Sequence, residues 1–290
     1  MGAIVGIIIV FAMVFGGYMA AGGKMSIIIK ALPYEMMMIG GAAVGAFLVA
    51  NDGHTIKQTM RDFKIVFGGA KWKKQDYNDL LCLLFELIRI GQQNPLEIEQ
   101  HIETPEESTL FAKYPKIQSD KRAMEMICDT FRSGTMNFDD PHQVEDLLEK
   151  QLEDDYHESQ HSSHALQNTA DALPALGIVA AVLGVIKTMA SINEPPAILG
   201  GMIGGALVGT FLGVFLSYGF VGPFAAKLKA SAAQDQKFYS LIRDVLVANL
   251  HRHPANICIE VGRQNTPRDL RPSFNDLEAR LREVKSGAAA

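Results

Sequence analysis

One stretch of the sequence has the spacing of a zinc site. His157-Glu158-Ser159-Gln160-His161 fits the HExxH pattern, in which two histidines one helical turn apart bind zinc and the glutamate serves as general base. The longer form of this motif needs glycine where His164 stands, and the segment is polar rather than part of an apolar span. We therefore interpret it as a polar helix face and keep a membrane zinc protease as an alternative.

No other set of residues indicates catalysis. The sequence has no Ser/His/Asp set on a turn, no glycine-rich phosphate loop after a strand and no carboxylate pair placed for acid–base work. Its cysteines, at positions 82, 128 and 258, lack CxxC spacing, which indicates core thiols in the cytosol. The net charge of −5, without a basic face, argues against nucleic-acid binding. We predict a protein that is not an enzyme and needs no metal or cofactor.

Two prolines and a threonine occur inside apolar segments. Residues 172–191 and 198–224 are each long enough for a helix of about 20 residues to cross a ~30 Å hydrocarbon core. Pro174 and Pro223 each remove a backbone N–H at membrane depth, which is tolerated where neighbouring helices or a water-lined cavity satisfy the freed carbonyl. Thr210 adds a hydroxyl between them. These residues favour a membrane hairpin that is more than an anchor, although ordinary packing within a helical bundle is left open.

Glycines recur at a spacing that brings membrane helices together. A glycine at every fourth position leaves one ridge of a helix bare, so that a neighbouring backbone can pack closely against it. The predicted packing residues are Gly41, Gly45, Gly201, Gly205, Gly209 and Gly213.

The elements that carry these residues are four predicted spans. Residues 1–23 lack the basic start of a signal peptide, so we interpret them as a retained first span, and 33–51 form a short second span. Lysines and arginines follow the second and fourth spans, which places both termini and the middle of the chain in the cytoplasm. The predicted domains are residues 1–51 (spans one and two), 52–171 (a cytoplasmic helical domain), 172–226 (spans three and four) and 227–290 (a cytoplasmic helical region).

The middle segment is predicted to be helical. The apolar run 80–90 indicates a buried helix, and Asn94-Pro95, Thr104-Pro105 and Asp140-Pro141 each have the pattern of a helix start. Residues 139–158 are strongly acidic, which fits a solvated face or a docking face. Behind the last span we expect an amphipathic helix to Leu250, a linker, a helix opened by Ser273 and a disordered tail, 286–290.

The spans lack groups that titrate at membrane depth. Their apolar cores contain no Asp, His or Arg, and Glu35 and Lys187 are expected toward span ends, where long side chains reach the interface. A proton relay needs a titratable group within the membrane. A partner must therefore supply that group if this chain conducts protons.

Several stretches closely resemble the MotA family of flagellar motor stator proteins, within the wider MotA/TolQ/ExbB proton channel group. They are residues 14–23, 33–53, 102–108, 173–186, 208–223 and 271–285, in the family's order. The resemblance implies an inner-membrane subunit in a pentameric ring around a dimer of MotB, a single-span partner that carries the membrane aspartate. Ion flow would turn the ring against the rotor protein FliG, with lipid around the spans. A TolQ/ExbB-like energiser of outer-membrane transport is the alternative, and it should have three spans.

The resemblance also implies residue roles. The ion-path positions are Pro174, Ala181, Thr210, Tyr218 and Pro223. Sodium-driven relatives have a threonine where Ala180 and Ala181 stand, so we expect proton drive. Glu99 occupies the family's rotor-facing acidic position, whereas Gly91 replaces its arginine, which leaves Arg89 as the nearest base for the rotor contact.

Overall fold

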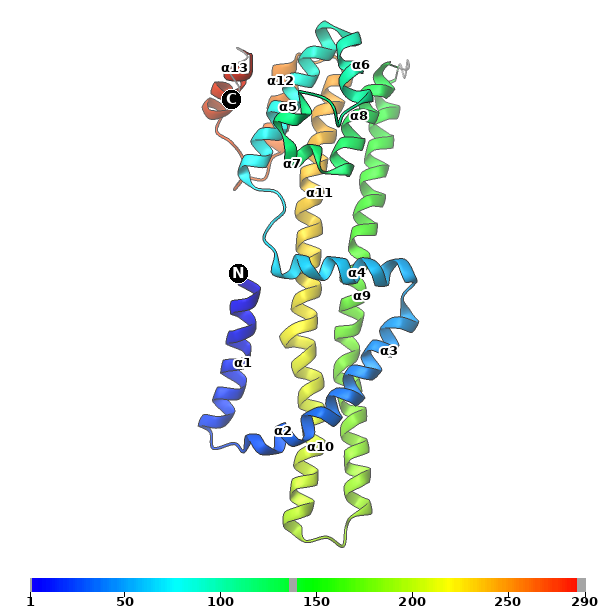
Figure 1. Ribbon diagram of the computed structural model, residues 1–290, viewed down its shortest axis with the longest axis vertical. Helices are drawn as coiled ribbons and strands as arrows, with labels where there is room; N and C mark the ends of the chain where they lie inside the picture. The colour runs from blue at the N-terminus through cyan, green and yellow to red at the C-terminus, as the bar shows by residue number, and fades with distance from the viewer. Residues whose placement is uncertain (1, 136–139, 286–290) are drawn as a thin grey trace. The chain divides into compact units, whose positions relative to one another are not determined.

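The computed structural model describes residues 2–135 and 140–285, and every regular element among them is a helix (Figure 1). By length and composition, four of these helices can cross a membrane. The predicted all-helical class with four apolar spans is thereby confirmed. The chain divides into two compact units: a first unit of Met1–Gly69 and Ser159–Ser231, and a second unit of Ala70–Glu158 and Ala232–Ala290.

The first unit begins with apolar helices. α1 (Gly2–Ala20) is apolar on every side, and none of its described residues is buried within the chain. α2 (Met25–Glu35) and α3 (Gly41–Ala50) follow, joined by a π-helical turn at Met36–Gly40. A helix that is apolar all round and unburied fits lipid rather than water.

The second span begins earlier than predicted. We expected it to start at Pro33, but α2 begins at Met25 and contains Pro33. The loop expected before Pro33 is therefore helical from Met25 onward. A proline inside a membrane helix is tolerated where the backbone adjusts locally. The N–H of Met36 still bonds within the helix, to the carbonyl oxygens of Leu32 and Pro33. The local adjustment is the π-helical turn that follows at Met36–Gly40.

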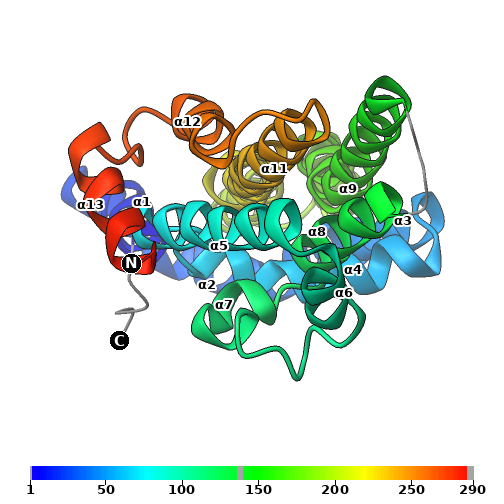
Figure 2. The same cartoon turned by 90° about the horizontal axis from the view of Figure 1, so that it is seen from above.

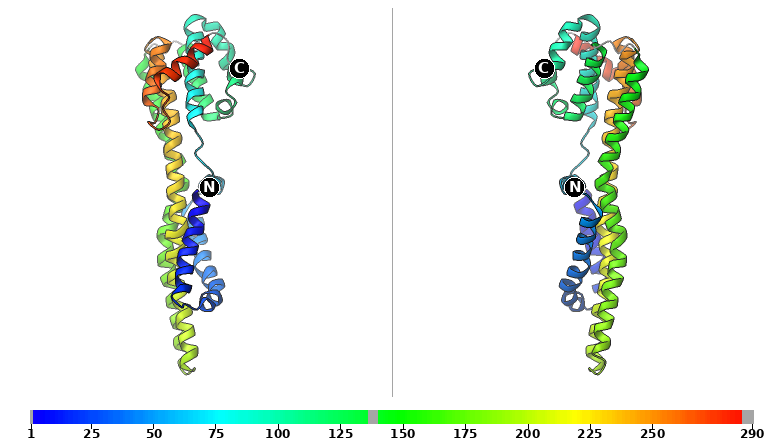
Figure 3. Two further views of the ribbon diagram at one scale, coloured as in Figure 1. Left: turned by 90° about the vertical axis from the view of Figure 1, so that its left-hand side faces the viewer. Right: turned by 90° about the vertical axis from the view of Figure 1, so that its right-hand side faces the viewer.

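A helical hairpin forms the centre of the first unit. Within this unit, α9 (Pro141–Ala190) runs beside α10 (Pro196–Leu216), and the chain reverses between them (Figures 1 and 3). A second π-helical turn, Ser217–Val221, links α10 to α11 (Gly222–Leu250). α9 and α11 each contribute residues to both units.

Aromatic rings connect α1 to this hairpin. The ring centroids of Phe11 and Phe215 are 5.5 Å apart, and those of Phe15 and Phe211 are 6.0 Å apart. Both pairs meet edge to face, the arrangement that aromatic quadrupoles prefer. Because phenylalanine carries no polar atom, these contacts hold the helices together without leaving a hydrogen bond unsatisfied in lipid.

The first unit also contains an amphipathic helix, α4 (Gly53–Phe67). Its start is capped, since the N–H of Thr55 donates to Oδ1 of Asp52 at 2.8 Å. The hydroxyl of Ser162 on α9 donates to Asp62 at 2.9 Å and holds α4 in place. Its outer surface mixes lysines with apolar side chains such as Met60, which is 73% exposed. Helices with this pattern lie in a membrane interface.

The core of the second unit is built around α5 (Lys74–Gln93). Its predicted apolar run is confirmed as buried, with Leu80, Leu83 and Leu87 fully enclosed. Helices that pack on α5 include α6 (Pro95–Glu103), α7 (Pro115–Gln118), α12 (Ala255–Asn265) and α13 (Phe274–Lys285), and α8 (Lys121–Thr135) packs on α6 and α7 (Figure 2). α11 also contacts α5, since the rings of Tyr77 and Phe238 meet edge to face.

The helix starts were predicted with mixed success. α6 begins at Pro95 and α9 at Pro141, as predicted, and the hydroxyl of Ser273 caps α13 by accepting the N–H of Asp276 at 3.1 Å. The start at Thr104-Pro105 is wrong: these residues form a turn, in which the N–H of Glu107 donates to the carbonyl of Thr104. The helix that begins at Pro141 is 50 residues long and continues through the predicted third span to Ala190.

A helix was also missed, and other expectations are untested. α12 occupies the region expected to be a linker, because Cys258, Ile259 and Gly262 form a small apolar stripe that packs on α5. The predicted tail, 286–290, and Asp139 lie outside the described residues. The predicted domain limits refer to the membrane surface, so they stay a prediction.

All three cysteines are buried and free of disulfides. This confirms the interpretation of Cys82, Cys128 and Cys258 as core thiols. Burial raises the pKa of each thiol to about 11, because an apolar core disfavours the charged thiolate.

Candidate functional site

The two helices of the hairpin touch through their backbones. A Cβ placed on Gly213 would lie 2.6 Å from the carbonyl oxygen of Leu173 and 2.9 Å from Cα of Gly177. A Cβ on Gly177 would in turn lie 2.8 Å from the carbonyl oxygen of Gly209. Only hydrogen fits at these positions without a backbone shift. The contact therefore fixes the register of α9 against α10 just beside Pro174.

Pro174 and Pro223 both lie near a contact between Ala170 and Gly222. Pro174 has no N–H to donate to the carbonyl of Ala170, which lies one helical turn before it. Ala170 is buried, and its Cβ lies 3.9 Å from a Cβ placed on Gly222, the residue before Pro223. The same Gly222 position is 3.0 Å from the carbonyl oxygen of Ser217. The π-helical turn Ser217–Val221, Pro174 and Pro223 thus all lie close to Ala170.

The other predicted ion-path residues differ in their surroundings. Ala180 is 2% exposed and packs against Gly209, and Ala181 beside it is half-buried. Thr210 is half-buried on α10. Tyr218 is 75% exposed, so its ring is directed away from the hairpin core. The structure brings Pro174, Ala181 and Thr210 to the packed hairpin, whereas Tyr218 is left on its surface.

The predicted packing glycines fall into two groups. Gly209 and Gly213 take part in the close contact just described. A Cβ on Gly205 would lie 4.0 Å from Ala31 of α2. Gly41, Gly45 and Gly201 have no described atom within 4 Å of such a Cβ, so they contact nothing closely within this chain.

The structure corrects the expectation for Glu35. We expected its carboxylate to extend toward the end of a span, but its side chain is only 5% exposed. A Cβ placed on Gly209 would lie 2.5 Å from Oε2 of Glu35. The carboxyl group therefore occupies the space that the glycine leaves open in the middle of α10. Sequence alone missed this residue, because the position of α2 against α10 depends on how the helices pack.

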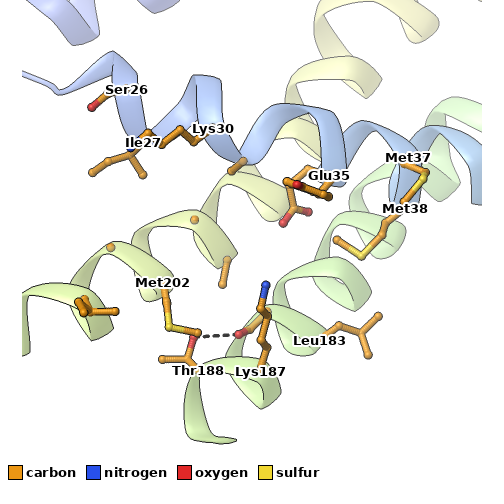
Figure 4. A pocket seen from close by; sticks show the side chains of 17 residues that line it. Ser26, Ile27, Lys30, Glu35, Met37, Met38, Leu183, Lys187, Thr188 and Met202 are labelled. Atoms are coloured by element: carbon orange, nitrogen blue, oxygen red, sulfur yellow. Dashed lines mark hydrogen bonds between the residues drawn. The ribbon is translucent and has the colours of Figure 1, made fainter. Parts of the chain in front are cut away.

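Glu35 also borders a pocket of about 670 Å³ between α2, α9 and α10. Lys30, Tyr34, Lys187 and Thr188 line the same pocket. Figure 4 shows the carboxyl group of Glu35 and the amino group of Lys187 both directed into it. The hydroxyl of Thr188 donates to the carbonyl of Gly184 at 2.9 Å. Lys187, like Glu35, belongs to this pocket; its side chain is exposed, which agrees with the expectation that it extends outward.

The predicted rotor-facing residues lie in the second unit. Glu99 is exposed on α6, whose other face is fixed by the buried Ile98 and Ile102. Arg89 is half-buried near the end of α5. Neither charge forms an ion pair with a described residue. Gly91 faces Phe131, whose nearest ring carbon lies 3.6 Å from a Cβ placed on the glycine.

The HExxH residues do not belong to the group of side chains that lie close enough together to bind a metal ion. His157 and His161 are exposed on α9. Among the described residues, the side chains close enough to share an ion are His142, Glu145 and His251, with ligand atoms within 4.8 Å of one another. Two of the three are exposed, and all belong to the second unit, apart from the hairpin.

Comparison with known proteins gives consistent matches. The family models for the motility protein A N-terminal region and for the MotA/TolQ/ExbB proton channel family match residues 4–95 and 119–240. The chain is 39% identical to motility protein A of Salmonella typhimurium and 37% identical to that of Escherichia coli K12, over 98% of this chain and 96% of each relative. It is 34% identical to chemotaxis protein LafT of Vibrio parahaemolyticus, over 96% of this chain and 97% of that protein.

Two solved structures share the fold. The C. jejuni MotAB structure has a TM-score of 0.73 at 17% identity, covering 94% of this chain and 98% of that chain. The flagellar MotAB stator complex from Bacillus subtilis has a TM-score of 0.74 at 19% identity, covering 94% and 99%.

Proposed function

The chain belongs to the motility protein A members of the MotA/TolQ/ExbB proton channel family, and from this premise we propose how it works as a stator subunit of the bacterial flagellar motor. Stator subunits of this family are membrane-embedded and are not enzymes. The work of the chain is therefore divided between an ion path in the first unit and a force-transmitting surface in the second.

The chain acts in an assembly with a MotB-like, single-span partner that carries the membrane aspartate. We propose five copies around a partner dimer. The bare surfaces of the first unit support this, since α1 has no described residue that is buried and Gly41, Gly45 and Gly201 meet no close neighbour. Small-residue surfaces of this kind let another backbone approach. Neighbouring copies, the partner and lipid would cover them.

The proposed location is the bacterial inner membrane, with both termini in the cytoplasm. The amphipathic helix α4 supports this orientation, because its lysines and exposed apolar residues suit the cytoplasmic interface. The limits 51/52, 171/172 and 226/227 would then mark where the chain crosses that interface.

The observation that carries the mechanism is the backbone contact between α9 and α10 beside Pro174. A close-packed contact shifts between discrete arrangements rather than deforming smoothly. Pro174 and the wide turn before Pro223 leave backbone carbonyls without their usual helical donors, which gives the hairpin two places to bend. Protonation of the partner's aspartate, close to Thr210 and Ala181, would shift the hairpin and move the second unit against the rotor.

The proposed ion is the proton. Sodium must exchange its water shell for several protein oxygens, whereas a proton needs a carboxyl group and a water path. Ala180 and Ala181 provide no oxygen in their side chains, and Ala180 is packed against Gly209. Thr210 is then the hydroxyl available at this depth.

The proposed rotor contact uses Glu99, with Arg89 as its basic counterpart, against FliG. Glu99 is exposed on a helix that the buried Ile98 anchors to the core. A rigid support with an exposed charge suits a contact that forms and releases at each step. The TolQ/ExbB-like alternative is disfavoured by the four apolar helices and by the full-length match to motility protein A.

Swimming of a stator-deletion strain tests the proposal. This chain and its partner should together restore swimming, and each alone should fail. Swimming should persist without sodium and stop when a protonophore dissipates the proton gradient. Failure of the pair to restore swimming, with both proteins present in the membrane, would overturn the stator function. Dependence on sodium alone would overturn only the choice of ion.

A further inference from the structure

Glu35 is a buried acid whose carboxyl group lacks a complete set of partners. Its side chain is 95% buried, and Oε2 has no hydrogen-bond partner among the described residues. An ionised carboxylate in this position would cost several kcal/mol unless donors reached it. The side chain is held in place all the same, because Gly209 leaves room for the carboxyl group in the middle of α10.

Few groups within the chain can satisfy this carboxyl group. The charged or titratable residues that line the same pocket are Lys30 and Tyr34 on α2 and Lys187 on α9, and α10 contributes none. The hydroxyl of Thr188 is already used by the carbonyl of Gly184. No ion pair joins Glu35 to a lysine among the described residues. The remaining donors are water molecules or a proton on the carboxyl group itself.

The pocket provides the route for that water. Its volume of about 670 Å³ is many times the ~30 Å³ that one water molecule occupies in the liquid. It is lined by α2 along its whole length, from Ser26 to Glu35, and by the last two turns of α9 and the first half of α10. In the proposed orientation, this is the side of the membrane opposite the cytoplasm, where protons enter.

We propose that Glu35 is a proton-binding residue of the ion path, loaded through this pocket. A proton from pocket water binds Oε2 of Glu35 beside Gly209. It then leaves the same carboxyl group, through water, for the membrane carboxylate of the partner, and Glu35 returns to its starting state. The relay rests on the proposed function, whereas the proton-binding property of Glu35 can be measured without it.

Infrared spectroscopy of the purified complex tests the first part. A protonated carboxyl group has a carbonyl stretch that shifts in D₂O and disappears when the group ionises as pH rises. We expect such a band in the complex, its loss in Glu35→Gln, and a displaced band in Glu35→Asp. The matched control is Glu194→Gln, an exposed acid between α9 and α10, which should leave the band unchanged. Other protonated carboxyl groups, such as the partner's aspartate, can leave a band in Glu35→Gln, so the test is the difference between the two spectra. A spectrum from which Glu35→Gln removes no carbonyl band would overturn the proposal.

Motility tests the second part. Glu35→Gln keeps the size and hydrogen-bonding shape of the side chain, so it should reach the membrane at the normal level while most of the proton flux is lost. Glu35→Asp should retain part of the flux, because it still binds a proton. Normal speed with Glu35→Gln would exclude the relay even if the infrared band is assigned to Glu35. If the unaltered complex does not drive swimming at all, the stator function fails, and the infrared result still decides whether Glu35 binds a proton.

Discussion

The carbonyl oxygen of Leu173 approaches Gly213 so closely that a Cβ placed on this glycine would lie 2.6 Å from it. We therefore predict that Gly213→Ala destabilises the hairpin by about 1–3 kcal/mol, because overpacking against backbone forces the two helices apart. Gly200→Ala is the matched control, since no described atom lies within 4 Å of its Cβ position. That change should stabilise α10 slightly through helix propensity. Thermal unfolding of the purified complexes measures both, and equal effects would contradict the role assigned to the contact.

A second prediction separates the effect of Pro174 on torque from its effect on assembly. Pro174→Ala should leave membrane assembly nearly intact, because alanine fits a helix and can donate to the carbonyl of Ala170. Torque should fall sharply, since a regular helix at this point stiffens the hairpin beside Gly213. Membrane levels and the speed of tethered cells under load provide the two measurements. Loss of assembly together with torque would mean that Pro174 is only structural.

The sequence predicted well those features that depend on local chemistry. The apolar run in α5, the proline that opens α6 and the hydroxyl of Ser273 that caps α13 each act within one or two helical turns, so their residues alone determine the outcome. The four apolar spans follow from composition over a similar length.

Features that depend on packing were missed or misplaced. Glu35 is near the start of the predicted second span, and only the register of α2 against α10 brings its carboxyl group to Gly209. α12 forms because Gly262 lets it approach Leu81 and Val245, which a short polar segment with few apolar residues does not indicate. Thr104-Pro105 has the pattern of a helix start, but the residues after it turn back toward the core at Leu110.

The buried cysteines give a prediction for the second unit at alkaline pH. Burial raises the pKa of Cys82, Cys128 and Cys258 from 9.0 to about 11, so the folded state favours the neutral thiol. The stability that this provides is present below pH 9 and is lost as pH rises toward 11. The unfolding temperature should therefore fall across this window. Substitution of the three cysteines by alanine should make the fall shallower, and an unchanged slope would count against the thiols.

The burial of the three cysteines also predicts that their thiols are modified slowly, because the thiolate is the reactive form. A maleimide reagent at neutral pH should label the folded protein far more slowly than the denatured protein. Ser119→Cys provides an exposed control, since Ser119 lies on the surface of the second unit. Labelling of the native cysteines at the rate of this control would show that the core opens readily.

The last prediction concerns the transfer of force to the rotor. A contact that forms and releases at each step cannot depend on a large dry interface, because deep apolar burial slows dissociation, whereas exposed charge pairs are weak singly and form quickly. Glu99 is exposed on α6, while Ile98 and Ile102 hold that helix to the core. Reversal of the charge in Glu99→Lys should therefore impair swimming without affecting folding or membrane insertion. A reversed charge on the switch protein FliG should partly restore it.

The need for a basic residue in the rotor contact can be tested by placing an arginine at Gly91. A Cβ at this position would lie 3.6 Å from the ring of Phe131, an ordinary van der Waals contact, so a side chain can begin here without a shift of the backbone. If the contact needs a base here, Gly91→Arg should restore the swimming lost in Arg89→Glu. Glu153→Lys, on the exposed face of α9, is the matched charge reversal outside this surface and should swim normally. Normal swimming with Glu99→Lys and Arg89→Glu, together with a defect in Glu153→Lys, would move the rotor contact to the acidic helix between Glu145 and Glu158.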